Sequence, residues 1–84
     1  MPDISCLSKA EMQKEYIIVD VIGSTEERIR LFDLGFSPKS RVTPLYKAMC
    51  GGTTAFLIKG TLIAIRQEEC EKILISVPFR GDGM

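Results

Sequence analysis

The segment from Thr53 to Arg66 constrains the fold of this chain more than any other. Two six-residue runs rich in β-branched, aromatic and other apolar residues, TTAFLI and TLIAIR, are joined by Lys59 and Gly60. Such runs, separated by two residues that include a glycine, are typical of a β-hairpin. We therefore predict that Ile58 pairs with Thr61 across this turn. The pairs that follow are Leu57 with Leu62, Phe56 with Ile63 and Ala55 with Ala64.

A strand and a helix are predicted before the hairpin. The run YIIVDV, from Tyr16 to Val21, has the alternation of a strand and ends before Gly23. Ser24, with Glu27 three residues later, forms the pattern of a capping box, so we expect a helix over residues 25–34. The strand places Ile17, Val19 and Val21 on one face, and the helix carries Ile29, Leu31, Phe32, Leu34 and Phe36 at helical spacing.

Two further strands complete the predicted fold. Arg41–Lys47 reads as a strand, but Pro44 cannot donate a ladder hydrogen bond, so this strand must lie at an edge or contain a bulge. Gln67–Cys70 is expected to form one helical turn before a last strand, Lys72–Val77. Five short strands and one helix predict a mainly β fold, a small closed barrel without free edges. Whether residues 1–6 are ordered or disordered is left open. Residues 49–53 are expected to form a loop, and residues 78–84 are expected to form a flexible tail.

Length and charge limit the function. With 84 residues the chain has room for one domain, over residues 1–77. The formal net charge is zero, so the electrostatic signature of a nucleic-acid binder is missing. No apolar run approaches the roughly 20 residues of a membrane span. The N-terminus lacks the pattern of a signal peptide, so we expect a cytoplasmic protein.

Catalytic chemistry is not indicated. The chain contains no histidine and no phosphate-binding or nucleophile-elbow motif, so we predict neither an enzyme nor a cofactor. Adjacent residues on a helix diverge, so the pairs Glu26–Glu27 and Glu68–Glu69 are interpreted as solvated rather than as catalytic or metal sites. The three unpaired cysteines, which are Cys6, Cys50 and Cys70, fit a reducing compartment and are interpreted as small, partly buried apolar residues.

One ordered set of motifs resembles a known family. RLFDLGFSP, from Arg30 to Pro38, is followed by the Lys59-Gly60-Thr61 turn and by IAIRQEE, from Ile63 to Glu69. In this order the segments are similar to the ferrous iron transport protein A (FeoA) family, and the resemblance covers about residues 7–77. It implies an SH3-like barrel and an accessory role in bacterial ferrous iron uptake. The partner that it implies is the cytosolic GTPase domain of the FeoB-type iron permease.

The hairpin departs from this family on its outer face. Members often carry charged residues there, whereas this chain has Ala55, Leu57, Leu62 and Ala64. We interpret these four residues as an apolar strip that docks a partner or a second copy of the chain. The alternative is that the N-terminal segment covers the strip, through Leu7 or Met12.

Two other functions remain open. The SH3-like domain also resembles the C-terminal domain of iron-dependent repressors, where it contributes to metal sensing and interdomain contact. The residues before Gly23 are too few for a winged helix, so the chain would be such a domain on its own. Direct iron binding is the second alternative. It would depend on Asp33, the glutamate pairs or the thiols, because imidazole ligands are missing.

Overall fold

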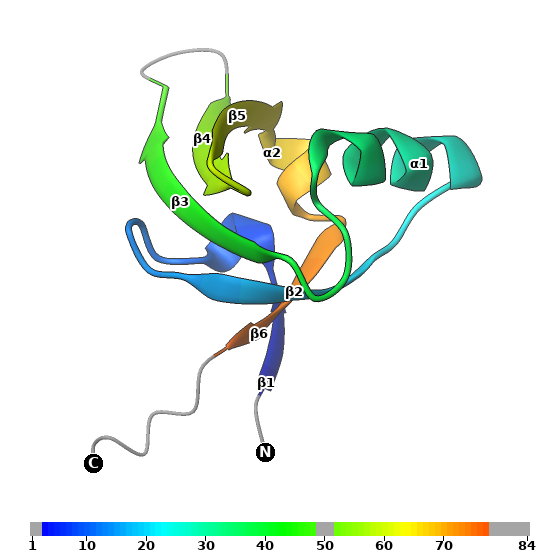
Figure 1. The fold of residues 1–84 in the computed structure, drawn as a ribbon, viewed down its shortest axis with the longest axis horizontal. Helices are drawn as coiled ribbons and strands as arrows, with labels where there is room; N and C mark the ends of the chain where they lie inside the picture. The colour runs from blue at the N-terminus through cyan, green and yellow to red at the C-terminus, as the bar shows by residue number, and fades with distance from the viewer. Residues whose placement is uncertain (1–2, 49–51, 78–84) are drawn as a thin grey trace.

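The computed structural model describes residues 3–48 and 52–77. The order of elements along the chain is β1 (Asp3–Cys6), the 3₁₀ helix η1 (Leu7–Lys9), β2 (Tyr16–Val21), α1 (Thr25–Leu34), β3 (Arg41–Lys47), β4 (Thr53–Ile58), β5 (Thr61–Arg66), α2 (Gln67–Cys70) and β6 (Ile73–Val77). Within the described ranges, the strands form one antiparallel sheet in the order β1-β6-β2-β3-β4-β5 (Figure 1). The predicted tail, Cys50 and most of the predicted loop lie outside these ranges.

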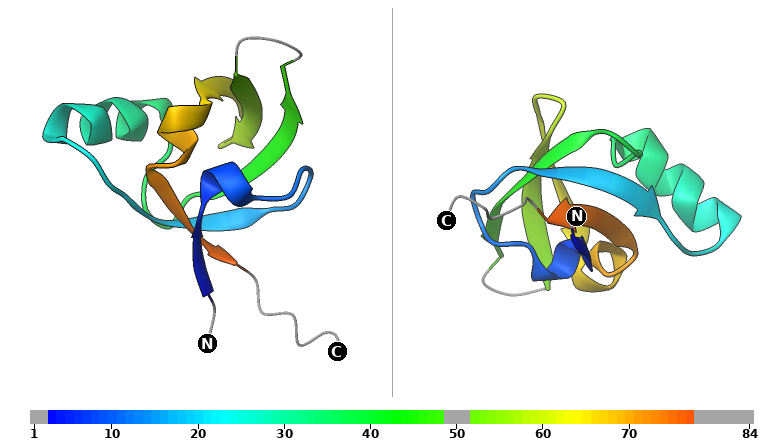
Figure 2. Two further views of the ribbon diagram at one scale, coloured as in Figure 1. Left: turned by 180° about the vertical axis from the view of Figure 1, so that it is seen from behind. Right: turned by 90° about the horizontal axis from the view of Figure 1, so that it is seen from below.

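The sheet is not closed into the barrel that the strand count predicted. Its two ends are β1 and β5, and the strand pairs of the described residues do not join them. The helical turn α2 contacts both β5 and η1, which directly follows β1, so these two short elements fill the end of the core between the terminal strands (Figure 2). Leu7 of η1 and Cys70 of α2 are both buried there.

The sixth strand, β1, was not predicted from the sequence. Asp3–Cys6 (DISC) alternates polar and apolar residues over only four positions, which is too short a run to distinguish, and it is ordered by pairing with β6 across the whole length of the chain. A strand that forms by pairing with a segment this distant in sequence is hard to predict from its own residues. The elements β2, β3, α1 and α2 have the predicted bounds. The predicted last strand begins one residue later than expected, at Ile73.

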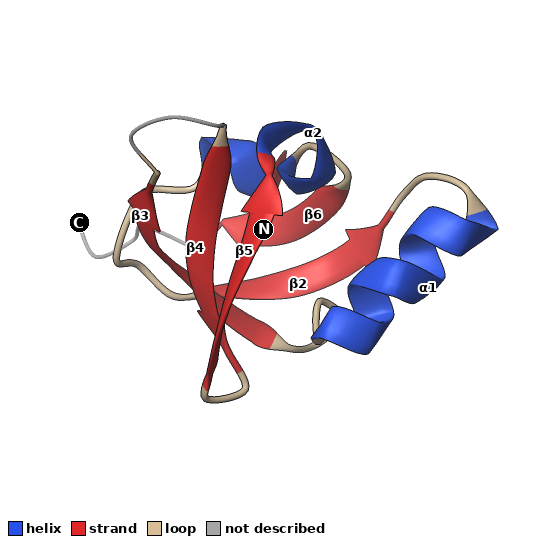
Figure 3. Ribbon diagram, turned by 90° about the horizontal axis from the view of Figure 1, so that it is seen from above, coloured by secondary structure: helices blue, strands red, loops and turns tan. Residues whose placement is uncertain are grey.

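The core lies where the two halves of the bent sheet cross. Figure 3 shows β2 and β6 running across β4 and β5 at a steep angle. Phe36, which follows α1, meets Phe56 of β4 edge to face, with 5.8 Å between the ring centroids. The buried core residues are Leu7, Tyr16, Ile18, Val21, Leu31, Phe36, Val42, Phe56, Ile58, Ile65, Cys70, Ile73 and Ile75.

Helix α1 begins and ends as predicted. The Glu27 amide donates to Ser24 Oγ at 3.2 Å, and the Ser24 amide donates to Glu27 Oε1 at 2.8 Å, so the capping box is present. Gly35 ends the helix with a φ of 112°. The predicted apolar stripe is narrower than expected, because α1 projects from the body of the molecule (Figure 1) and its first half is joined to it by polar contacts such as the hydrogen bond from Arg28 Nε to the Val21 carbonyl. Ile29 is therefore 53% exposed, although Leu31 is buried.

Bulges change which face two strands present. In β2 the register with β6 shifts between Ile18 and Asp20, so Val21 turns into the core while Ile17 stays exposed. The prediction that these two residues share a face is therefore wrong. In β3 the register with β4 shifts between Pro44 and Tyr46. The expected bulge at Pro44 is confirmed. The edge position is wrong, since β3 pairs with both β2 and β4.

Candidate partner-binding surface

The hairpin has the predicted register. Ile58 pairs with Thr61 and Leu57 with Leu62, and the ladder continues without a shift to Thr53 and Arg66. Lys59 and Gly60 make the two-residue turn with φ values of 52° and 77°. Positive φ at both turn positions matches the right-handed twist of the strands, which explains why so short a connection fixes the register.

The predicted strip is exposed over most of its length. Leu57 and Leu62 lie side by side, 42% and 55% exposed, and Ala64 is also exposed. Ala55 is the exception, because it is only 6% exposed. It lies on the inner strand β4 between Tyr46 of β3 and Ala64 of β5, so its small side chain is flanked by neighbouring strands on both sides.

The predicted cover by the N-terminal segment is not formed. Leu7 packs in the core cluster with 2% of its surface exposed, so it is an internal residue. Met12 remains 36% exposed. Within the parts of the chain that the structure describes, Leu57 and Leu62 therefore face outward.

The structure adds Tyr46 to this surface. Regular alternation after Thr43 would turn Leu45 outward and Tyr46 inward, but the bulge after Pro44 pairs Tyr46 with Ala55 and places it on the outer face. Tyr46 is 55% exposed. Pro44 was the available sequence signal, because it required an irregularity without showing which residue would move outward. We call Tyr46, Leu57, Leu62 and Ala64 together the hairpin face.

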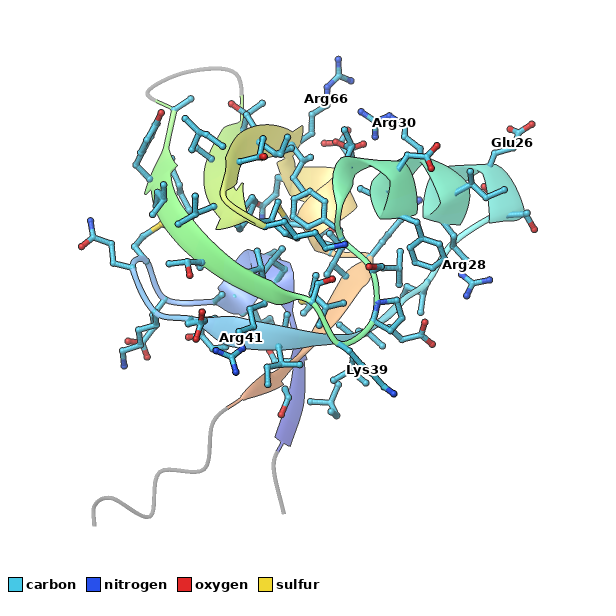
Figure 4. All side chains as sticks on the ribbon, in the orientation of Figure 1. Glu26, Arg28, Arg30, Lys39, Arg41 and Arg66 are labelled. Carbon is cyan, nitrogen blue, oxygen red and sulfur yellow. The ribbon has the colours of Figure 1, made fainter. Side chains whose placement is uncertain are left out.

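The strands β3, β4 and β5 carry basic but no acidic residues, although Arg41 at the start of β3 lies 3.7 Å from Glu15. Between Asp33 and Glu68 the sequence contains no acidic residue, although both signs occur 11 times in the whole chain. The same interval holds five exposed cationic residues, which are Lys39, Arg41, Lys47, Lys59 and Arg66. Figure 4 labels Lys39, Arg41 and Arg66, which project outward from the molecule. The chain as a whole has a net charge of zero, but the adjacent strands β3, β4 and β5 contain only basic charged residues.

The acidic pairs are tied into ion pairs between α1 and the end of the chain. Glu27 binds Lys72, and Glu69 binds Arg30, around a cavity of about 80 Å³. The hydrogen bond from Lys72, with that from the Ser24 amide, lowers the pKa of Glu27 to about 2. Glu26, Glu27 and Glu68 are exposed, as the interpretation of solvated pairs expected. Glu69 is partly buried, so it departs from that interpretation.

The two described cysteines differ in burial. Cys70 is 1% exposed, and burial raises the pKa of its thiol to about 11, as suits a small apolar residue. Cys6 is partly buried, with its sulfur 3.0 Å from Ser8 Oγ. Among the described residues, no group of three His, Cys, Asp or Glu side chains is placed to hold a metal ion.

A second exposed apolar surface lies on the other half of the sheet. Ile4 of β1 and Ile17 of β2 flank Ser76 of β6 in one cross-strand row, 52% and 47% exposed, and Val19 is 40% exposed. Beside Ile17 is a cavity of about 260 Å³ that Glu15 and Arg41 also line. We call Ile4, Ile17 and Val19 the β2 face. Sequence analysis did not single it out, because the burial of one side of β2 could not be told from alternation alone.

Comparison with known proteins decides the family. The model of the FeoA domain matches residues 6–77, which is nearly the whole chain and includes every element of the sheet except part of β1. The chain belongs to the FeoA domain family. The resemblance inferred from the order of its motifs is thereby confirmed, and with it a connection to ferrous iron transport.

Solved structures of FeoA proteins share the fold. A FeoA-like protein from Clostridium acetobutylicum superposes with a TM-score of 0.82 at 20% identity, over 94% of this chain and 92% of the other. A FeoA protein from Chlorobium tepidum has a TM-score of 0.78 at 24% identity, over 88% and 70%. The sequence matches none of the curated proteins with which it was compared.

The same SH3-like fold occurs in a larger regulator. A manganese-dependent transcriptional repressor has a TM-score of 0.80 at 13% identity, over 93% of this FeoA chain and 44% of its own. At such identities the likeness shows the fold alone. None of the helices in the described part of this chain is long and apolar enough to span a membrane.

Proposed function

We propose that this FeoA-family chain is a cytoplasmic accessory protein of ferrous iron uptake that acts by binding rather than by catalysis. Its proposed partner is the GTPase domain of the FeoB-type permease, and the proposed binding surface is the hairpin face. Membership of the FeoA family suggests the partner, and the exposed residues of this chain suggest the binding surface.

The observation that carries the proposal is the exposure of Leu57 and Leu62 as a cross-strand pair. The inward side chains beside them, Phe56 and Ile58, are each 1% exposed, so the core contacts of β4 are made without Leu57. Contiguous apolar area left outside such a core is typical of a surface that a partner covers. Tyr46 enlarges this area with a rigid aromatic ring of a kind enriched at interface centres.

A pull-down with the purified GTPase domain tests the proposal. The wild-type chain is expected to be retained in at least one nucleotide state, and the double variant Leu57→Lys with Leu62→Glu is expected to lose retention. Ile29→Lys is the matched control, because Ile29 is an equally exposed apolar residue on α1. Following GTP hydrolysis in the same samples shows whether binding changes turnover.

Two outcomes would count against the proposal. Retention of the double variant at the wild-type level, with unchanged circular dichroism, would remove the hairpin face from the contact. Absence of wild-type binding in both nucleotide states would remove the GTPase domain as the partner.

The second candidate is a metal-sensing or interdomain role like that of repressor domains. The structural likeness to the manganese-dependent repressor favours it. Calorimetric titration with iron(II) and manganese(II) separates the two candidates. A stoichiometric metal site, together with no binding to the GTPase domain, would favour sensing over the accessory role.

A further inference from the structure

The free side of β5 lies along one edge of the hairpin face. Within the described ranges, β5 pairs only with β4, so it is an end strand of the sheet. Its six residues run without a bulge and contain no proline, and the one charged residue among them is Arg66 at the end of the strand. Natural sheets usually protect an edge with bulges, prolines or charges along its length, because unpaired backbone groups can accept another strand.

The other end of the sheet is a poorer template. β1 has four residues against six in β5. A longer, regular edge gives more backbone hydrogen bonds to an added strand. Strand addition is therefore favoured at β5.

The side chains along β5 indicate what kind of strand would fit. Leu62 and Ala64 point outward and offer apolar contacts at every second position. Lys59 and Arg66 stand at the two ends of this stretch, and both are exposed. A segment that alternates apolar and acidic residues would match both features, because its carboxylates would meet Lys59 and Arg66, and the strands β3, β4 and β5 contain no acidic residue.

A second copy of this chain offers a poorer charge match. If two β5 strands paired antiparallel about a twofold axis with Thr61 of one copy opposite Arg66 of the other, the added strand would bring another arginine and no carboxylate. The homodimer that the sequence also allowed is therefore the less favourable occupant.

From these observations we infer that the partner contributes an extended acidic segment that adds to the free edge of β5 and covers the hairpin face. This inference rests on the proposed binding function of that face and names the chemistry of its partner. The cations would speed association and orient the segment, while the apolar contacts and backbone hydrogen bonds would hold it.

Two synthetic peptides test the chemistry directly. One is a twelve-residue peptide that alternates Glu with Leu, and the other replaces each Glu with Lys. Fluorescence anisotropy at 50 mM salt is expected to show binding of the Glu peptide at least about tenfold tighter than that of the Lys peptide. On binding, the amide protons of β5 are expected to gain protection from exchange.

Charge reversal provides the matched variants. Lys59→Glu with Arg66→Glu is expected to weaken Glu-peptide binding at least about fivefold at 50 mM salt, with the difference shrinking at 500 mM because salt screens exposed charges. Lys9→Glu with Lys14→Glu makes the same charge change outside the strands β3, β4 and β5 and is expected to have little effect. Equal binding of both peptides, or no effect of the Lys59 and Arg66 reversal, would overturn the inference.

Other anionic ligands are outcomes of the same test. Tighter binding to phosphatidylglycerol vesicles or to single-stranded DNA than to the Glu peptide would overturn the assignment of a protein segment. Repeating the titrations with the GTPase domain separates the two proposals. Binding to that domain without salt dependence would refute the acidic segment alone, and binding to the peptide but not to the domain would refute the named partner alone.

Discussion

Leu57 and Ile58 are neighbours on β4, and truncating each to alanine tests the assignment of the two hairpin faces. Ile58 is 1% exposed and belongs to the hydrophobic core cluster. Removing a buried aliphatic side chain of this size typically costs 2–5 kcal/mol, so Ile58→Ala is expected to cost about 3 kcal/mol. Leu57 is 42% exposed, so Leu57→Ala removes less buried surface and is expected to cost about 1 kcal/mol or less.

Urea unfolding followed by circular dichroism measures both costs. With a slope of about 1 kcal/mol per molar for a domain of this size, Ile58→Ala should lower the midpoint by about 3 M and Leu57→Ala by about 1 M or less. The slopes should agree with the wild type, since a changed slope would report a changed denatured state. Equal losses from the two variants, or a larger loss at Leu57, would refute the assignment of Leu57 to the outer face.

Three further predictions concern the described ion pair, the thiols and the helix cap. The folded-state pKa of Glu27 is about 2, below its ordinary 4.5, so its contribution to stability is present above pH 4.5 and is lost as the pH falls toward 2. Lys72→Met should raise the pKa of Glu27 measured by NMR titration. An unchanged pKa would contradict the ion pair. Cys70, with its thiol pKa raised to about 11, should react with a thiol reagent at pH 8 more slowly than Cys6 and only at the rate of unfolding; fast labelling of Cys70 in the folded state would show that it is accessible. Ser24→Ala should cost about 1 kcal/mol in urea unfolding by removing the N-cap, whereas Ser24→Asp should keep most of that stability; equal losses would argue against capping.

The hairpin and α1 could be predicted from the sequence because local residues determine them. The Lys59-Gly60 turn and the alternation on both sides fix one register, and Ser24 with Glu27 fixes a helix start. In each case the deciding groups lie within a few residues of one another, so the pattern is readable without tertiary information.

The bulges and the sheet edges could not be predicted in the same way. Whether Val21 or Ile17 faces the core depends on the register with β6, more than 50 residues away in sequence. The strand β1 pairs with β6, and its own alternation covers only four residues, too few to predict a strand. Tyr46 reaches the hairpin face only because the bulge after Pro44 shifts the ladder with β4.

The uneven distribution of acidic residues along the chain is visible in the sequence, but only the fold shows which strands it makes basic. An interval of 34 residues without a carboxylate, from Leu34 to Gln67, is hidden in a net charge of zero. It becomes informative once β3, β4 and β5 are seen to be adjacent strands of one sheet.

The most direct test of the central claim is an NMR titration of the ¹⁵N-labelled chain with the unlabelled GTPase domain of the permease. The account predicts that the largest shift changes cluster at Tyr46, Leu57, Leu62 and Ala64 and continue along β5. Changes confined to the β2 face at Ile4, Ile17 and Val19 would contradict it, as would a saturating titration that leaves the hairpin signals unmoved.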